Sequence, residues 1–197
     1  MPPDLPPRNP YIAGKALGDE RSFFGREDTF RLVETVLSSA DQNALVLFGQ
    51  RRIGKTSILL QLRSRLPSEL FRPVYFDLMD RARKPFSTVL YELAATIACE
   101  FNLPQPQVAD FAEGDHFRES FLPSLYRRLD KDLRPVLLLD EFDVLDVAAE
   151  EQLPATAAAR AFFPYLRRMM EGEPLLAFVF VVGRKADDLS IDIKATF

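Results

Sequence analysis

Apolar side chains recur at intervals of three and four residues in several segments, which is the spacing of a helix with one buried face. The strongest stripe includes Phe86, Val89 and Leu93. The spacing predicts helices over residues 27–39, 54–66, 86–101, 117–129 and 155–171. Because a proline cannot donate a backbone hydrogen bond, we expect Pro123 and Pro164 to kink or interrupt the last two helices.

Four short apolar runs alternate with these helices. They cover residues 44–48, 73–77, 135–140 and 176–182, and they have the length and continuous hydrophobicity of strands that are buried on both faces. Strands that alternate with helices form a parallel sheet covered by helices on both sides. The pattern therefore predicts a three-layer α/β fold, with a loop over residues 102–115.

The first ten residues contain five prolines, which predicts an extended arm, either a simple tail or a PxxP ligand. We expect the proline-rich arm to cover residues 1–22 and one domain to cover residues 23–197. The chain has 197 residues, of which 47% are hydrophobic and 27% are charged, so it can bury one globular core.

Charge and composition exclude several classes of protein. The net charge of −4 provides no general attraction to nucleic acid or to an anionic membrane. No apolar run approaches the ~18 residues of a membrane helix, and the N-terminus lacks the apolar segment of a secretory signal. The single cysteine cannot form an internal disulfide, which fits a reducing compartment. We therefore expect a cytoplasmic protein with no membrane partner.

Gly49, Gly54, Lys55 and Thr56 match the phosphate-loop pattern GxxxxGK[ST]. The pattern follows a predicted strand and opens a predicted helix, which is the context that this chemistry needs. The glycines let backbone N–H groups turn toward phosphate oxygens, and the helix adds the positive end of its dipole. Lys55 can then reach the terminal phosphates of a nucleotide, and the Thr56 hydroxyl can bind Mg²⁺.

A pair of acids ends the strand predicted at residues 135–140. The run VLLLDE places Asp140 at the carboxyl edge of the sheet, where open α/β sheets bind ligands. Asp140 is suited to hold Mg²⁺ through water, and Glu141 is suited to orient or polarise an attacking water. We expect Asp143 and Asp146 to be solvated loop acids.

Other kinds of site lack the necessary residues. His116 is the only histidine and Cys99 the only cysteine, so the chain has neither a zinc ligand set nor a Cys–His pair. We expect Cys99 to be a small packing residue and His116 to lie at the surface. The 17 phenylalanines fall at core spacing, which favours a packed interior over a platform for stacking bases.

Four stretches taken together point to a family. They are residues 23–27 (FFGRE, preceded by NPY at 9–11), 47–57 (LFGQRRIGKTS), 138–143 (LLDEFD) and 180–184 (FVVGR). The combination resembles the additional-strand P-loop ATPases of the AAA+ superclass, and more narrowly the STAND, archaeal-type and Orc-like ATPases. The resemblance implies a sheet in the order 2-3-4-1, in which the fourth strand lies between the phosphate-loop strand and the strand that ends at Asp140.

The resemblance also implies roles for individual residues. Phe24, Gly25 and Arg26 would lie against the adenine, Arg184 would sense the γ-phosphate, and Lys55, Glu141 and Arg184 would form the catalytic set. The nucleotide would be held by Gly49, Gln50, Arg51, Arg52, Ile53, Gly54, Lys55, Thr56 and Ser57, with the metal at Thr56 and Asp140. Arg26 could instead be an ordinary helix residue and Arg184 a solvated cation. Arg51 and Arg52 could bind phosphate, pair with acids or face a partner subunit.

The chain departs from the family pattern at its end. In this family a fifth strand, a helical lid and usually a winged-helix domain follow the fourth strand. Since the sequence stops at Phe197, we expect a truncated core in which the fifth strand and the lid are missing. Such a core would leave the strand at 44–48 on the sheet edge and would weaken hydrolysis more than binding.

The expected ligands are ATP or ADP and Mg²⁺. ATP is favoured over GTP because no DxxG glycine follows Asp140, and because an arginine at 184 replaces the asparagine of the guanine-reading motif. The resemblance implies an ATP-hydrolysing conformational switch in a larger signalling or assembly protein, with protein partners or self-assembly. Two alternatives stay open: a non-hydrolysing nucleotide-binding scaffold, and an Orc-like DNA-associated ATPase, which the net charge of −4 disfavours.

Overall fold

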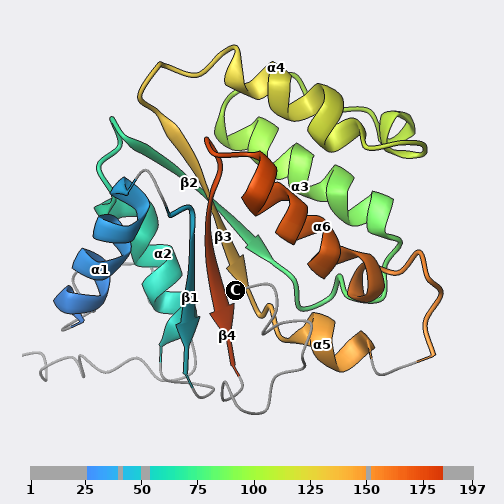
Figure 1. The fold of residues 1–197 in the computed structure, drawn as a ribbon, viewed down its shortest axis with the longest axis horizontal. Helices are drawn as coiled ribbons and strands as arrows, with labels where there is room; N and C mark the ends of the chain where they lie inside the picture. The colour runs from blue at the N-terminus through green and yellow to red at the C-terminus, as the bar shows by residue number, and fades with distance from the viewer. Residues whose placement is uncertain (1–25, 40–41, 50–53, 150–151, 184–197) are drawn as a thin grey trace, which may run out of the picture.

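The computed structural model of the chain describes residues 26–39, 42–49, 54–149 and 152–183. These residues form a parallel sheet with helices on both faces (Figure 1). The strands are β1 (Ala44–Phe48), β2 (Phe71–Asp77), β3 (Arg134–Asp140) and β4 (Ala177–Val182). Their spatial order is β1-β4-β3-β2. The predicted three-layer α/β fold and the strand order 2-3-4-1 are confirmed, and among the described strands β1 pairs only with β4.

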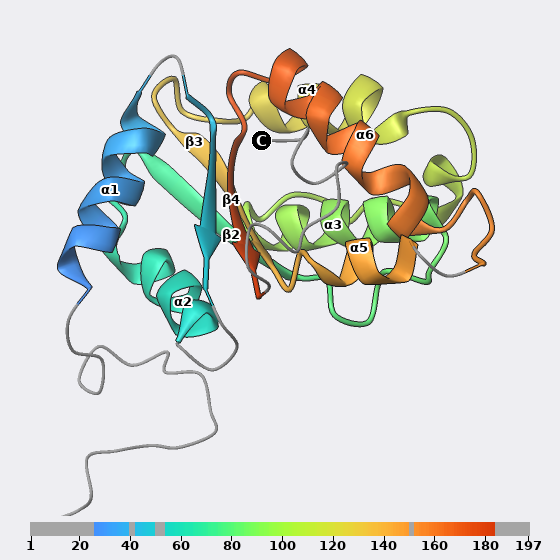
Figure 2. The same ribbon diagram turned by 60° about the horizontal axis from the view of Figure 1, so that its bottom comes forward.

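Two sets of helices enclose the sheet (Figures 1 and 2). One face is covered by α1 (Glu27–Ser38) and α2 (Lys55–Arg65). The other face is covered by α3 (Phe86–Glu100), α4 (Leu122–Tyr126) and α6 (Ala158–Gly172). A short helix, α5 (Val144–Ala149), follows β3. The arm expected over residues 1–22 lies outside the described residues.

The side chains of the central strand β4 show how the two layers of helices pack against the sheet. Every residue of β4 is buried, and its side chains alternate between the two faces. Phe178 and Phe180 point into the core below α3 and α6, whereas Val179 and Val181 point toward α1 and α2. The core between the sheet and helices α3 and α6 thus contains the two aromatic rings. The continuous hydrophobicity of β4 follows from its being covered on both faces.

Helix α6 begins at Ala158, three residues later than predicted, because alanine content alone extended the predicted helix too far. Ala157 is still extended, and the backbone N–H groups of Ala158 and Ala159 donate to the carbonyls of Lys84 and Ala82, both at 2.9 Å. The loop after β2 therefore caps the helix in place of a side chain.

The two prolines have different effects. Pro164 lies inside α6, and the helix continues past it. Because Pro164 is exposed, water can hydrate the carbonyl that loses its N–H partner. The segment around Pro123 is divided instead into a π-helical turn, η3 (Phe117–Phe121), and α4, which ends at Tyr126 rather than at residue 129. The predicted interruption is thus found at Pro123 and not at Pro164.

Candidate functional site

The carboxyl ends of β1, β3 and β4 lie together at one edge of the sheet. Phe48 is level with Val182, and Leu139 is level with Phe180. Beyond the strands, the N–H of Gly49 donates to the carbonyl of Val182 at 3.3 Å. The phosphate-loop sequence and the acidic pair therefore begin at the same edge of the sheet, on either side of β4, although they are far apart in the chain.

A hydrogen bond joins the two ends of the phosphate loop, Gly49 and Lys55, at the start of α2. Gly54 precedes the helix with φ +90°, a left-handed conformation that favours glycine. Lys55 is the first helical residue and is only 9% exposed, and its Nζ donates to the carbonyl of Gly49 at 2.7 Å. Thr56 is half-buried and Ser57 is buried. Gln50, Arg51, Arg52 and Ile53 lie outside the described residues.

Asp140 is a buried acid held by neutral donors. The residue is 2% exposed. Oδ2 accepts a hydrogen bond from the Tyr75 hydroxyl at 3.0 Å, and Oδ1 accepts one from the N–H of Glu141 at 2.9 Å. Within the part of the chain that the structure describes, no lysine or arginine pairs with this carboxylate. Since aspartates are almost never buried unless they are paired or bind a cation, the site fits a bound metal ion.

Glu141 turns the chain sharply at the end of β3. It has φ +51°, an uncommon conformation for a residue with a side chain. The turn brings the N–H of Phe142 to the carbonyl of Val181 at 3.0 Å. The Phe142 ring is buried against Phe163 and Phe180, with ring centroids 5.1 and 4.7 Å apart. The strained residue beside Asp140 is therefore held by a packed aromatic anchor.

The prediction that Asp143 and Asp146 are solvated is wrong, because each is 4% exposed. Asp143 Oδ1 accepts a hydrogen bond from the N–H of Gly183 at 3.0 Å. Asp146 lies in the first turn of α5. The chain after β3 folds back over the end of β4 instead of leaving into solvent, and this return buries both acids.

Of the other predicted site residues, the structure describes only Arg26. Arg26 is exposed at the N-cap of α1, where its carbonyl accepts from the N–H groups of Thr29 and Phe30 at 2.9 and 3.2 Å. Phe24, Gly25 and Arg184 lie outside the described residues.

The two residues that were expected to have no chemical role differ in their placement. Cys99 is exposed, so the prediction that it packs in the core is wrong. It falls two residues after Ile97, off the buried stripe of α3. His116 is half-buried, and its ring lies 5.0 Å from that of Phe111. Its side chain is 28% exposed, so His116 lies partly at the surface.

Tyr75 is the residue at this edge that the sequence pattern did not single out. It lies on β2, level with Leu138 of β3. Burial and the negative charge of Asp140 raise the pKa of the Tyr75 phenol well above its ordinary value, so the hydroxyl stays protonated and donates. The expected strand order could have pointed to Tyr75. It places β2 next to β3, and Tyr75 lies two residues before the end of β2, close to the end of the strand that carries Asp140.

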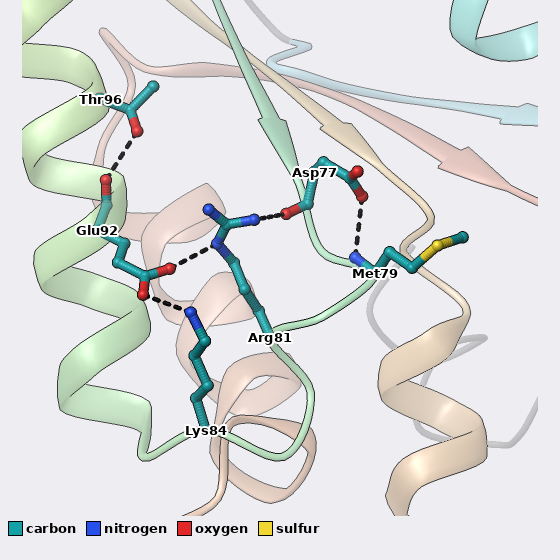
Figure 3. A network of polar contacts seen from close by, with 6 residues as sticks. All are labelled: Asp77, Met79, Arg81, Lys84, Glu92 and Thr96. Atoms are coloured by element: carbon teal, nitrogen blue, oxygen red, sulfur yellow. Dashed lines mark hydrogen bonds and ion pairs between the residues drawn. The ribbon is translucent and has the colours of Figure 1, made fainter. Parts of the chain in front are cut away.

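Charged contacts fix the end of β2 beside Asp140 (Figure 3). Arg81 donates to the carbonyl of Asp77 and to Glu92 of α3, and its guanidinium lies 4.5 Å from the centre of the Phe76 ring. Lys84 donates to the same Glu92 at 2.6 Å. Burial alone would raise the pKa of Glu92, but the hydrogen bonds from Lys84 and Arg81 hold it below its ordinary value. The acid is therefore ionised and anchors the loop to α3.

The chain belongs to the AAA domain family, whose model matches residues 38–189. It is thus a P-loop ATPase domain of the AAA type. No curated protein matches the sequence at a significant level. Among the described residues, no helix is long and apolar enough to cross a membrane, and no three His, Cys, Asp or Glu side chains gather as a metal-ligand cluster.

Two solved structures share the fold. The Walker-type ATPase PABY2304 of Pyrococcus abyssi has a TM-score of 0.57 and 17% identity over 86% of this chain and 48% of its own. The Orc2 protein of Aeropyrum pernix, in ADPNP and ADP complexes, has a TM-score of 0.52 and 18% identity over 79% of this chain and 39% of its own. The chain therefore spans about half of the first of these proteins and less of the second.

Proposed function

We propose that this domain binds ATP with Mg²⁺, hydrolyses it, and acts as a nucleotide-dependent conformational switch within a larger signalling or assembly protein. One observation carries the proposal. Asp140 is a buried carboxylate with no lysine or arginine partner among the described residues, and it lies at the same sheet edge as the start of α2, where the phosphate-loop sequence ends. The two features have the charges needed for a metal ion and for phosphate groups.

Each part of the edge has a place in this proposal. Residues 49–57 would surround the phosphates, with Lys55 exchanging the carbonyl of Gly49 for a phosphate oxygen. Thr56 and Asp140 would hold Mg²⁺, which when bound neutralises charge on the phosphates. Glu141 would accept the proton of the attacking water, and Arg184 would contact the γ-phosphate. Phe24, Gly25 and Arg26 would lie against the adenine.

The contacts beyond the acidic pair support the switch. Asp143 connects the loop after β3 to Gly183, directly before Arg184. Phe142 connects the same loop to the core below α6. A change at the γ-phosphate can therefore alter both the end of β4 and the packing of the α3–α6 layer. Partners would be other proteins or further copies of the domain, and the single cysteine supports a cytoplasmic location.

The proposal is tested by titrating the protein with ATP and GTP, with Mg²⁺ and with EDTA, and by measuring phosphate release. We expect saturable binding of ATP that Mg²⁺ strengthens, weaker binding of GTP, and slow release of phosphate. Binding without any phosphate release would favour the non-hydrolysing scaffold. A rate that rises only when DNA is added would favour the DNA-associated ATPase, and the lack of any nucleotide binding would exclude all three functions.

A further inference from the structure

The Tyr75 hydroxyl holds one oxygen of the candidate metal-binding carboxylate. It donates to Asp140 Oδ2 at 3.0 Å, across 65 residues of sequence. The other oxygen, Oδ1, accepts from the N–H of Glu141 at 2.9 Å. Each carboxylate oxygen therefore has one fixed donor, and the remaining lone pair on each oxygen has a fixed direction.

The donor stands on a rigid element. β2 and β3 pair in register from Phe71 and Arg134 to Asp77 and Asp140, and beyond them the N–H of Leu78 donates to the carbonyl of Asp140 at 3.1 Å. The end of β2 is further fixed by Arg81 (Figure 3). The backbone of Tyr75 is thus held in place, and its hydroxyl reaches Asp140 from a neighbouring strand that is paired along its whole length.

We propose that Tyr75 is a positioning residue that orients the Asp140 carboxylate for Mg²⁺ and so sets the metal dependence of nucleotide binding. The inference rests on the proposed function. Groups that hydrogen-bond a metal ligand fix its orientation, and their loss commonly lowers metal affinity by about 10- to 100-fold. Among the described residues, the Tyr75 hydroxyl hydrogen-bonds to Asp140 and to no residue of the phosphate loop. Its removal should therefore affect binding mainly when the metal is present.

The test is Tyr75→Phe, which removes the hydroxyl and keeps the ring. Binding of ATP is measured by calorimetry in EDTA and over a series of Mg²⁺ concentrations. We expect the affinity in EDTA to stay within about twofold of the wild type, and the Mg²⁺ concentration for half-maximal effect to rise about 10-fold. The folded state of each variant is checked by thermal unfolding without nucleotide.

Tyr126→Phe is the matched control. The Tyr126 hydroxyl also donates from a half-buried tyrosine to a carboxylate, Glu173 Oε2, at 3.2 Å, but it lies in the α3–α6 layer. We expect its removal to leave the Mg²⁺ dependence unchanged.

The outcomes separate the inference from the function on which it rests. If the wild type binds ATP in a Mg²⁺-dependent way and Tyr75→Phe shows the same dependence, the positioning role is wrong and the proposed function stands. An equal loss of affinity in EDTA and in Mg²⁺ would show that Tyr75 is only structural, which also overturns the inference. A wild type that binds no nucleotide would overturn both.

Discussion

The two halves of the sheet edge hold their charged groups in different ways. In the phosphate-loop half, Lys55 bonds to a carbonyl only six residues earlier, and Gly54 makes the turn that allows it. In the acidic half, Asp140 bonds to Tyr75 across 65 residues, and Asp143 bonds to Gly183 across 40. The first half is a local motif that one stretch of sequence encodes. The second exists only after three strands have assembled.

This difference has consequences for how each half responds to change. A local motif can lose a side chain while the surrounding strands keep their pairing, so the expected damage is to binding. A buried acid that connects distant segments supports both chemistry and stability, because its partner is left unsatisfied when it is removed. Substitutions in the phosphate-loop half should therefore weaken binding more than stability, whereas substitutions in the acidic half should lower stability as well.

The largest effect is expected at Glu141, the acid proposed to activate the attacking water. We expect Glu141→Gln to keep Mg²⁺-dependent ATP binding and to lower turnover by roughly 10²- to 10⁴-fold, because the amide cannot accept the proton of the attacking water. Turnover is measured by phosphate release, with Glu119→Gln, at an exposed position of η3, as the control. Wild-type turnover in Glu141→Gln would move the role to another acid.

In the phosphate-loop half, we expect Lys55→Ala to weaken ATP binding by on the order of 100-fold. The reason is the loss of charge-assisted hydrogen bonds to phosphate, worth about 3 kcal/mol together. Calorimetry measures the affinity, and thermal unfolding should show that the fold persists. Lys131→Ala, at an exposed lysine before β3, is the control. Unchanged affinity in Lys55→Ala would contradict the assignment of the loop.

In the acidic half, we expect Asp143→Ala to lower the free energy of unfolding by about 1–3 kcal/mol, because the N–H of Gly183 loses its acceptor. Chemical denaturation measures the change. Asp132→Ala, at an exposed acid, should change stability by less than ~0.5 kcal/mol. Equal, small effects of both substitutions would mean that Asp143 behaves as a solvated acid after all.

The smallest effect concerns backbone conformation alone. Gly54 and Gly114 have φ +90° and +70°, and a Cβ added at either meets no atom within 4 Å. We expect Gly54→Ala and Gly114→Ala each to cost about 1 kcal/mol of stability through backbone strain. Only Gly54→Ala should also weaken ATP binding, since Gly114 lies in the loop between α3 and η3. Equal binding by both variants would show that the turn at Gly54 has no part in the site.

The sequence alone was sufficient for most of the fold and for the turn at Gly54 that begins α2. Continuous apolar runs identified every strand to within two residues of its start. For β3 and β4 the reason is burial on both faces, which needs an apolar side chain at nearly every position. The predicted burial of residues 44–48 is wrong, because β1 is only half-buried and ends at the exposed Phe48. Gly54 and Lys55 were found because the geometry of a phosphate loop depends on the spacing of neighbouring residues, which a linear pattern contains.

Only the tertiary structure decided the surroundings of the acids. Asp143 and Asp146 follow a strand and resemble loop acids in sequence, yet the chain turns back at Glu141 and buries them. Tyr75 belongs to no motif, and its hydrogen bond to Asp140 depends on β2 lying next to β3 in register. Burial and long-range hydrogen bonds are properties of how segments meet, so no pattern within a single segment can specify them.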